Sequence, residues 1–349
     1  MHVVVRKPLT AVLAILSLPF AAFGRAQPVP TDSCGVDIAR FCQKASAQAD
    51  ELARCLNEHR DELSDPCRAA LPDLSRQITH GPLQRRYLVH LPRSFDNTKR
   101  FPVVLVFHGI SGSPEIMRQL TRMNEVADRD GFLVVYPEGI GKSWNAGGCC
   151  AEAAHSEADD VGFVSGLLED LEKIYPVDSS RIYAAGLDNG GMMAYRLARE
   201  LSRRITAVAS VGGTMGADLP RPQRPVPVLE MDALTDRKVP FQGGTGAEGL
   251  LAGEYLSVPE TIQWWIKTNY CRKKPADIVN DRFRHFDMEL YRPDRNEPGA
   301  PVVFYKMQEE GPAWPNGTDV AHGWASGARV QPVNASKIIW EFFSAHSLP

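Results

Sequence analysis

Asp188 is the residue with the clearest chemical consequence, because it stands at the apex of a strand–turn–helix pattern. Segment 181–191 predicts a β-strand, a sharp turn flanked by Gly186 and Gly190, and the start of a helix. A G-x-S-x-G turn of this kind lifts one nucleophilic side chain above a sheet at a helix N-terminus, and that side chain is normally serine. A carboxylate is a poor nucleophile toward an ester carbonyl, because the product is an anhydride. Its attack on an sp³ carbon gives an ester, which activated water must then hydrolyse.

The elements that must position this residue are visible from residue 80 onward, where apolar runs alternate with amphipathic helical patterns. Near-continuous apolar runs such as 103–107 are typical of strands buried on both faces of a sheet. Alternating strands and helices predict an α/β fold, with a mostly parallel sheet flanked by helices. The expected strands are 86–92, 102–108, 132–136, 181–187, 207–212, 226–231, 286–291 and 301–306, and the expected helices are 115–129, 160–175, 189–203, 257–268 and 335–346.

Several motifs in this region occur together in one known family. They are Phe107–Gly109, Val134–Gly139, Trp144–Cys150, Asp159–Phe163 and Gly186–Arg196. In combination they resemble the secreted polyhydroxybutyrate depolymerase and feruloyl esterase family of α/β-hydrolases, over roughly residues 84–346. The resemblance implies an α/β-hydrolase domain over residues 80–349, and a serine esterase acting on polymer or plant-wall esters.

The same resemblance assigns triad positions, and two of the three carry unexpected residues. Asp188 takes the nucleophile position, Asp236 keeps the acid position, and Pro312 stands where the family has its histidine. Proline has no general-base capacity, so the triad is incomplete. His322, in the same loop, is either a substitute base or an exposed loop residue. We therefore expect a catalytically degenerate binding protein, and the alternative is an active hydrolase that uses Asp188 or displaced residues.

The oxyanion hole is formally intact in this interpretation. The backbone N–H groups of Ile110 and Asn189 are its expected donors. We hypothesise that the Asp188 carboxylate itself occupies the hole, where the helix N-terminus and these donors would stabilise its charge. Asp188 and Asp236 lack further ligands in the sequence, so we predict neither a metal nor a cofactor.

Three further residues are candidates for the substrate pocket. His108 follows a strand in the oxyanion loop, and Trp144 and Trp314 belong to the motif segments and to the loop that carries Pro312. The alternative for each of them is a purely structural role as a buried residue of the fold.

Residues 27–79 are expected to form a separate, cysteine-rich helical module containing Cys34, Cys42, Cys55 and Cys67. We predict a helix that is broken near residue 46 and ends at about residue 57, followed by a short helix from residue 64. A unit this small cannot bury enough apolar core to be stable alone, so it needs disulfide bonds. Three pairings are possible, and the nested one, Cys34 with Cys67 and Cys42 with Cys55, suits two antiparallel helices. The segment resembles the cysteine-rich repeat of a Golgi glycoprotein family, which implies an interaction or spacer module. A plain stabilising appendage is the alternative.

The remaining cysteines are Cys149, Cys150 and Cys271. We expect Cys149 or Cys150 to bridge Cys271 and so to bring the pocket-lining loop to the helix at 257–268. The alternative is a bond between the adjacent Cys149 and Cys150.

The N-terminus has the pattern of a secretory signal peptide over residues 1–26, with Arg6 and Lys7 before an apolar run. After cleavage of this signal peptide the mature chain is expected to be secreted or periplasmic. No later segment is apolar enough to span a membrane. The formal net charge is −3, which gives no indication of a nucleic-acid partner. The expected partners are a polymeric or small ester, a glycan, or a partner protein.

Overall fold

The computed structural model describes residues 29–45, 49–71, 73–216, 220–243, 255–281, 286–295, 297–308, 314–317 and 333–349. The predicted signal peptide (1–26), Pro312 and His322 lie outside these residues. Within the described part of the chain, no helix has the length and apolar character needed to cross a membrane.

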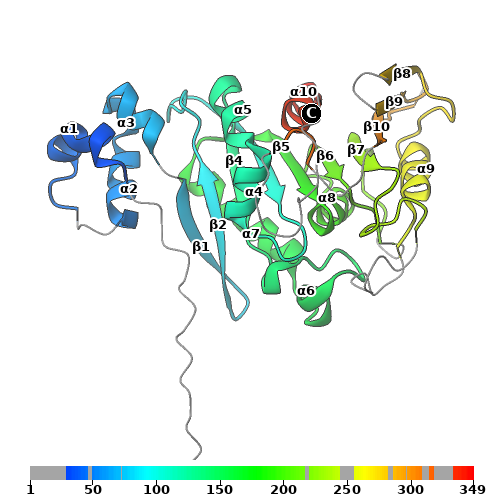
Figure 1. Ribbon diagram of the computed structural model, residues 1–349, viewed down its shortest axis with the longest axis horizontal. Helices are drawn as coiled ribbons and strands as arrows, with labels where there is room; N and C mark the ends of the chain where they lie inside the picture. Colours follow the sequence, from blue (N-terminus) through cyan, green and yellow to red (C-terminus); the bar gives the residue numbers. More distant parts are fainter. Residues whose placement is uncertain are drawn as a thin grey trace, which may run out of the picture.

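A single mixed sheet organises the main part of the chain (Figure 1). Its order is β1-β2-β4-β3-β5-β6-β7-β10-β9-β8. The central pairs, from β4 to β10, are parallel, whereas β1, β2, β9 and β8 pair antiparallel at the two edges. The strands are β1 (Leu74–His80), β2 (Leu83–His90), β3 (Phe101–Phe107), β4 (Leu133–Pro137), β5 (Val177–Leu187), β6 (Ala207–Val211), β7 (Val228–Ala233), β8 (Asp277–Asp281), β9 (Phe286–Tyr291) and β10 (Val302–Met307).

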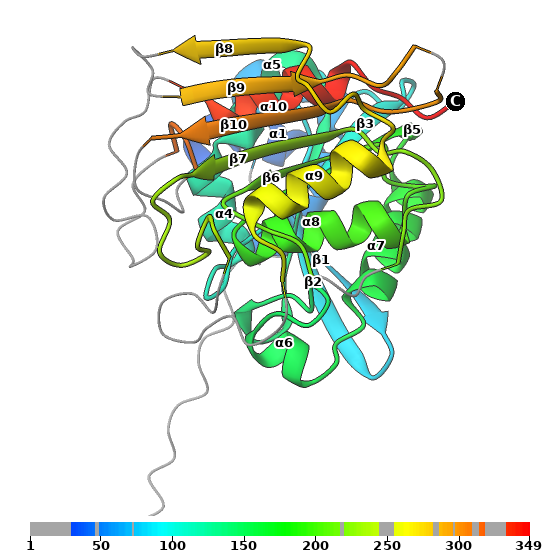
Figure 2. The same cartoon turned by 90° about the vertical axis from the view of Figure 1, so that its right-hand side faces the viewer.

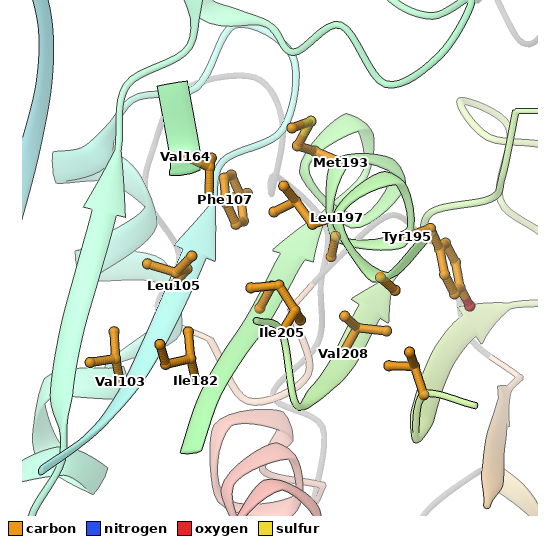
Figure 3. Close-up of a cluster of buried hydrophobic side chains, with 14 of the residues drawn as sticks. Val103, Leu105, Phe107, Val164, Ile182, Met193, Tyr195, Leu197, Ile205 and Val208 are labelled. Carbon is orange, nitrogen blue, oxygen red and sulfur yellow. The ribbon is translucent and has the colours of Figure 1, made fainter. Parts of the chain in front are cut away.

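Helices cover both faces of this sheet, as the parallel centre requires (Figures 1 and 2). One face packs under α7 (Asp160–Ile174), α8 (Asn189–Glu200) and α9 (Val258–Thr268), and the other under α4 (Pro114–Thr121), α5 (Met123–Asp130) and α10 (Ala335–Ser344). Strand β3 contributes side chains to the hydrophobic cores on both faces of the sheet. Val103, Leu105 and Phe107 belong to the core beneath α7 and α8 (Figure 3), and the alternate Val104 and Val106 belong to the opposite core.

The predicted α/β architecture is confirmed, and the departures from it have local causes. The helix expected at 115–129 is two helices, because Arg122 adopts a left-handed conformation (φ 51°) between α4 and α5. Strands β1 and β8 were not predicted. Both are edge strands that are exposed for much of their length, so they lack the apolar runs of the central strands.

The N-terminal cysteine-rich segment contains α1 (Thr31–Phe41), α2 (Ala49–Glu58), a 3-10 helix (Arg60–Glu62) and α3 (Asp65–Ala70). The disulfides are Cys34–Cys67 and Cys42–Cys55, so the nested pairing is confirmed. Strand β1 begins at Leu74 and already pairs with β2, so the sheet starts before the boundary expected at residue 80. The Arg60 guanidinium donates to the Leu91 carbonyl oxygen at 2.8 Å, which ties the segment to the end of β2.

A short helix, α6 (Ala151–His155), and a 3-10 turn (Ile140–Lys142) flank the segment that carries Trp144 and the two adjacent cysteines. This segment lies at the same end of the sheet as the turn between β5 and α8, and both come together in the candidate site.

Candidate active site

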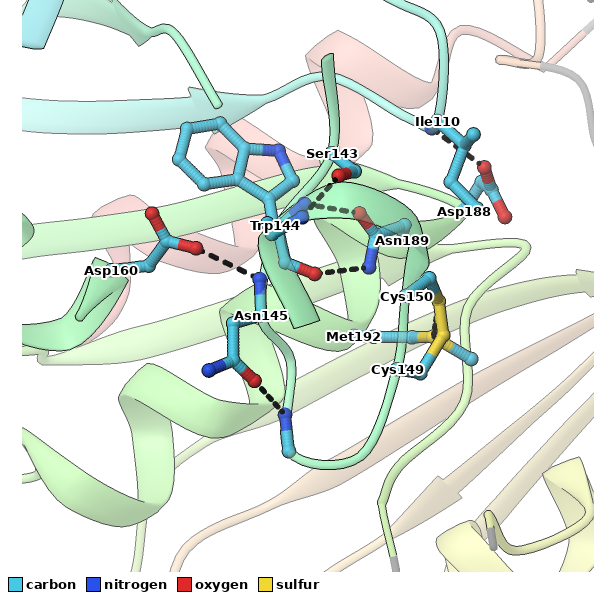
Figure 4. Close-up of a disulfide and its surroundings, with 12 residues drawn as sticks. Ile110, Ser143, Trp144, Asn145, Cys149, Cys150, Asp160, Asp188, Asn189 and Met192 are labelled. Atoms are coloured by element: carbon cyan, nitrogen blue, oxygen red, sulfur yellow. Dashed lines mark hydrogen bonds between the residues drawn. A yellow bond between two sulfur atoms is a disulfide. The ribbon is translucent and has the colours of Figure 1, made fainter. Parts of the chain in front are cut away.

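The turn that carries Asp188 connects the end of β5 to the start of α8 (Figure 4). Asp188 has φ 54° and ψ −123°, a combination that non-glycine residues rarely adopt and that costs conformational energy. The flanking residues Gly186 and Gly190 must be glycine, because there is no room for a Cβ atom at either position. A Cβ on Gly186 would lie 2.2 Å from the Gly190 carbonyl carbon, and one on Gly190 would lie 2.3 Å from the Phe107 carbonyl oxygen. The sequence pattern and the backbone therefore agree on a sharp turn that presents one side chain.

The Asp188 carboxylate is turned toward the loop after β3. The Ile110 N–H donates to Asp188 Oδ2 at 3.0 Å, a contact between residues 78 positions apart in the chain (Figure 4). Asp188 is 1% exposed. Burial raises the pKa of this carboxyl to about 6, although hydrogen bonds from the Ile110 and Asn189 backbone N–H groups lower it. The carboxylate is thus an anion held by backbone donors at a helix N-terminus.

The loop after β3 is itself fixed by hydrogen bonds around His108. Gly139 N–H donates to His108 Nε2 at 3.0 Å, so the ring carries its proton on Nδ1, which lies 2.8 Å from the Gly109 carbonyl oxygen. Burial lowers the pKa of His108 to about 4, so the ring is neutral. Both ring nitrogens are engaged, and His108 holds the loop in place rather than offering a free base.

Asn189 joins the turn to the segment that carries Trp144 (Figure 4). Its side-chain amide accepts from the Trp144 N–H at 2.6 Å and donates to the Trp144 carbonyl oxygen at 3.0 Å. The indole N–H of Trp144 donates to the His108 carbonyl oxygen at 2.9 Å, and its ring packs edge-on against Phe107. Trp144 is fully buried. The side-chain role of Asn189 was not predicted, because sequence reasoning considered its backbone N–H alone.

The cysteines of this segment are paired differently from the first expectation. Cys149 is bonded to the adjacent Cys150, and Cys271 is a free thiol, so the predicted bridge to Cys271 is wrong and the alternative holds. Cys271 lies beyond α9, where its thiol donates to the Ala300 carbonyl oxygen at 3.1 Å near the start of β10. Cys149 Sγ instead lies 3.6 Å from the Met192 sulfur on α8.

An apolar cluster includes Ile110 and Met192, whose backbone N–H groups donate to Asp188, and we call it the elbow cluster. Its buried members are Ile110, Ala146, Cys149, Cys150, Met192 and Val239, with Ala151 and Tyr255 packed against them. Ile110 and Val239 belong to this cluster and also donate backbone N–H groups to the two acidic side chains of the site.

Asp236 follows β7 and caps its own loop. Its Oδ1 accepts from the Lys238 N–H at 2.7 Å and from the Val239 N–H at 3.1 Å, the pattern of an Asx turn. Its Oδ2 is buried without a hydrogen-bond partner among the described residues. Burial raises the pKa of Asp236 to about 6, and its negative charge in turn raises the pKa of Asp188. The charge of Asp236 therefore acts on Asp188, the other carboxyl expected at the site.

Two more buried carboxyls, Glu230 and Asp232, lie on β7 and were not predicted. The Tyr195 hydroxyl donates to Glu230, and the Ser210 hydroxyl contacts its second oxygen at 3.3 Å. Neither oxygen of Asp232 has a hydrogen-bond partner in the described part of the chain. Burial raises the pKa of both groups well above the ordinary values. The sequence signal that could have identified them is their position, because Glu230 lies within the otherwise apolar run 226–231 and Asp232 follows it directly.

Trp314 is separate from this site. It belongs to the core on the opposite face of the sheet, where its indole N–H donates to the Ser336 hydroxyl at 2.9 Å. Within the described ranges, no group of three or more His, Cys, Asp or Glu side chains is placed to hold a metal ion.

The strand order, the turn after β5 and the loop after β3 together define an α/β-hydrolase. Two solved structures have the same fold. One, titled as a thermostable esterase, gives a TM-score of 0.51 at 16% identity and covers 79% of this chain and 63% of its own. The other, an acetyl xylan esterase from Aspergillus awamori, gives 0.51 at 13% identity and covers 77% and 98%.

Sequence comparison identifies the family within this class of protein. Residues 86–221 match the family described as esterase PHB depolymerase. The putative esterase NocK of Nocardia uniformis subsp. tsuyamanensis is 35% identical over 70% of this chain and 74% of its own. Feruloyl esterase B of Piromyces equi is 28% identical over 55% of this chain, but this chain spans only 37% of that longer protein. The chain belongs to the polyhydroxybutyrate depolymerase and feruloyl esterase family.

Proposed function

We propose that this chain is a degenerate member of its esterase family, which binds a ligand at the former active site without serine-esterase chemistry. The observation that carries the proposal is the hydrogen bond from the Ile110 N–H to Asp188 Oδ2, at 3.0 Å. In a serine esterase this N–H stabilises the oxyanion that forms on the substrate. A resident carboxylate at the same donor competes with that oxyanion through its own negative charge.

The other two triad positions and His108, in the loop after β3, support the same proposal. Asp236 at the acid position has its Oδ1 committed to its own loop. His108 is neutral and has both ring nitrogens engaged. By family resemblance, Pro312 takes the place of the histidine. Loss of the nucleophile or of the base alone lowers turnover by about 10⁶ in a well-studied serine protease.

We further propose that the protein acts outside the cytoplasm, after cleavage of a signal peptide over residues 1–26. Three disulfides in the described residues support an oxidising compartment, either the periplasm or the exterior. The proposed ligand is a small or polymeric ester, as in the relatives named for feruloyl and acetylxylan ester hydrolysis. The alternative ligands of this site are a glycan and a partner protein.

The test is hydrolysis of p-nitrophenyl acetate by the purified chain and by the Asp188→Ser/Pro312→His variant. We expect no turnover by the unmodified chain and measurable turnover by the variant. Ethyl ferulate should raise the melting temperature of the unmodified chain without being consumed. Turnover by the unmodified chain that Asp188→Asn abolishes would contradict the proposal and support an active hydrolase that uses Asp188.

A further inference from the structure

His90 lies where the N-terminal cysteine-rich segment joins the sheet, and its ring has a carboxylate on each side. Its Nδ1 lies 2.9 Å from Asp73 Oδ1, and its Nε2 lies 3.0 Å from Asp128 Oδ1. Asp73 immediately precedes β1, His90 is the last residue of β2, and Asp128 belongs to α5. The side chains of His90 and Asp73 are 13% and 4% exposed. One imidazole therefore joins the start of the sheet to both β2 and α5.

This geometry fixes the protonation state of the ring. An ionised carboxylate only accepts hydrogen bonds, so a ring nitrogen must donate to make either contact. A neutral imidazole donates from one nitrogen, whereas imidazolium donates from both. The two contacts of His90 therefore require imidazolium. Burial alone would lower the pKa of His90, but its contacts with Asp128 and Asp73 outweigh burial and raise that pKa above the ordinary 6.5.

The other charged and titratable groups around this contact keep their charge near neutral pH. The groups that face His90 and its two partners are Asp73, Asp128, Arg93, Arg118 and Tyr136. Burial raises the pKa of both carboxyls, but the contacts with His90 outweigh it and lower the pKa of each below the ordinary value. The two guanidinium groups stay ionised. Burial raises the pKa of Tyr136 well above its ordinary value, so its hydroxyl stays neutral. His90 is therefore the member of this set that changes charge near neutral pH.

The cysteine-rich segment, residues 29–71, lies beside the β1 edge of the sheet, with α2 against β1 (Figure 1). Its buried apolar side chains form a cluster of their own, and no described residue of the sheet belongs to that cluster. The Arg60 guanidinium instead donates to the carbonyl oxygens of Leu91 and Pro92, at 2.8 and 3.4 Å. These two residues directly follow His90. The polar contacts of the segment with the sheet are therefore concentrated beside the imidazole.

We propose that His90 is a pH-sensitive switch, which as imidazolium holds the junction at Asp73 and the cysteine-rich segment against the sheet, and which loosens both when it loses its proton. The neutral ring keeps one donor, so its other nitrogen presents a lone pair to a carboxylate oxygen, and that contact is lost. Because the folded pKa of His90 is raised, its stabilising contribution is complete below about 6.5 and is lost as the pH rises through the folded pKa. The proposal does not depend on ligand binding at Asp188, because none of these groups belongs to that turn.

The experiment is limited proteolysis of the intact, disulfide-bonded chain with thermolysin, from about pH 6 to about pH 9, because cleavage measures the open population of a site. The bond before Leu74 lies at the junction, and neither disulfide of the segment crosses it, so cleavage there releases the segment as a separate fragment. Each rate is divided by that of a synthetic peptide with the sequence of residues 69–79 at the same pH. We expect the corrected rate at Leu74 to increase above pH 6.5 by up to about tenfold per pH unit, the slope that one proton allows.

Three variants assign the effect to His90. Asp128→Asn keeps an oxygen that can accept from Nε2 but removes the negative charge, so the increase should move to lower pH. His90→Gln has no titrating group at this place, so its corrected rate should be high at every pH and independent of pH. His80→Gln is the matched control at the other end of β1, where the ring contacts Asp159 at 2.9 Å. It should behave as the unmodified chain does.

Cleavage sites elsewhere in the chain separate this switch from a general loss of stability. The buried carboxyl of Asp188 also destabilises the fold as the pH rises, because its pKa is raised to about 6. An equal increase of the corrected rate at all sites, a corrected rate at Leu74 that does not change with pH, or the same pH dependence in His90→Gln would overturn the inference. Ester hydrolysis by the unmodified chain would overturn the proposed function but not this result.

Discussion

The Asn189 side chain holds Trp144 by both backbone polar groups, with N···O distances of 2.6 and 3.0 Å. Asn189 is the first residue of α8 and follows Asp188 directly, so the helix that presents the carboxylate also fixes the segment that leads to Cys149 and Cys150. Asn189 and Trp144 are both fully buried. The geometry of the turn and the position of the cystine segment are therefore coupled through a single side chain.

Replacing Asn189 by alanine should destabilise the fold. The change leaves the buried Trp144 N–H without its partner, whereas the Trp144 carbonyl oxygen still accepts from the Cys150 N–H at 3.0 Å. One unpaired buried group of this kind costs about 1–3 kcal/mol, so we expect the free energy of unfolding, measured by urea denaturation, to fall by about that amount. Asn280→Ala, on the exposed edge strand β8, is the matched control and should change stability by less than about 0.5 kcal/mol. Equal effects of the two changes would refute the role assigned to Asn189.

A second prediction concerns the glycine at the start of α8. In Gly190→Ala the new Cβ would lie 2.3 Å from the Phe107 carbonyl oxygen, a backbone atom that cannot move without shifting β3. We expect this variant to be strongly destabilised, or recovered only as aggregated protein. Gly35→Ala is the contrast, because a Cβ there meets nothing within 4 Å and alanine favours the helix α1. The melting temperature of Gly35→Ala should be equal to or above that of the unmodified chain.

The sequence predicted the parallel centre of the sheet because its strands are continuous apolar runs buried on both faces, such as 103–107. It did not predict β1 and β8, whose mixed side chains match an exposed edge as well as a loop. The break at Arg122 was also missed. A left-handed arginine has no sequence signature, since that conformation is usually adopted by glycine or asparagine.

For the site, the turn around Asp188 and the acid loop at Asp236 were predictable because glycine spacing and short-range hydrogen bonds are local properties. The disulfide between Cys149 and Cys150 was not predictable, because the sequence allowed these cysteines to bond either to each other or to Cys271. Glu230 was missed for a similar reason. Its partners, Tyr195 and Ser210, come from α8 and β6, and only the fold brings them to β7.

A third prediction separates the two disulfides of the N-terminal segment. Cys34–Cys67 closes a loop with sequence separation 33, and Cys42–Cys55 one with separation 13. Chain entropy makes the longer loop more costly to close, so its disulfide contributes about 4 kcal/mol against about 3 kcal/mol. Serine replacement of the Cys34–Cys67 pair should therefore increase protease cleavage within residues 29–71 more than replacement of the Cys42–Cys55 pair. The reverse order would show that native-state packing, rather than loop entropy, decides their contributions.

The last prediction uses the raised pKa of Asp188. Its folded pKa of about 6 exceeds the ordinary value of 3.8, so the folded state holds this proton more tightly than the unfolded state. The stabilising contribution is therefore complete below the unfolded pKa and is lost as the pH rises through the folded one. In Asp188→Asn the neutral amide can still accept from the Ile110 N–H without titrating.

At about pH 4 the variant should match the unmodified chain, and at about pH 7 it should be more stable, by up to about 3 kcal/mol. Urea denaturation of both proteins across this range measures the difference. Asp96→Asn gives the opposite sign, because hydrogen bonds lower the pKa of Asp96 and its ionised form stabilises the fold at the higher pH. If Asp188→Asn lost stability at pH 7, the carboxylate would be gaining more from its two backbone donors than burial costs it. The anion position at Ile110 would then be a favourable site for negative charge, and Asp188 a stabilising replacement for serine.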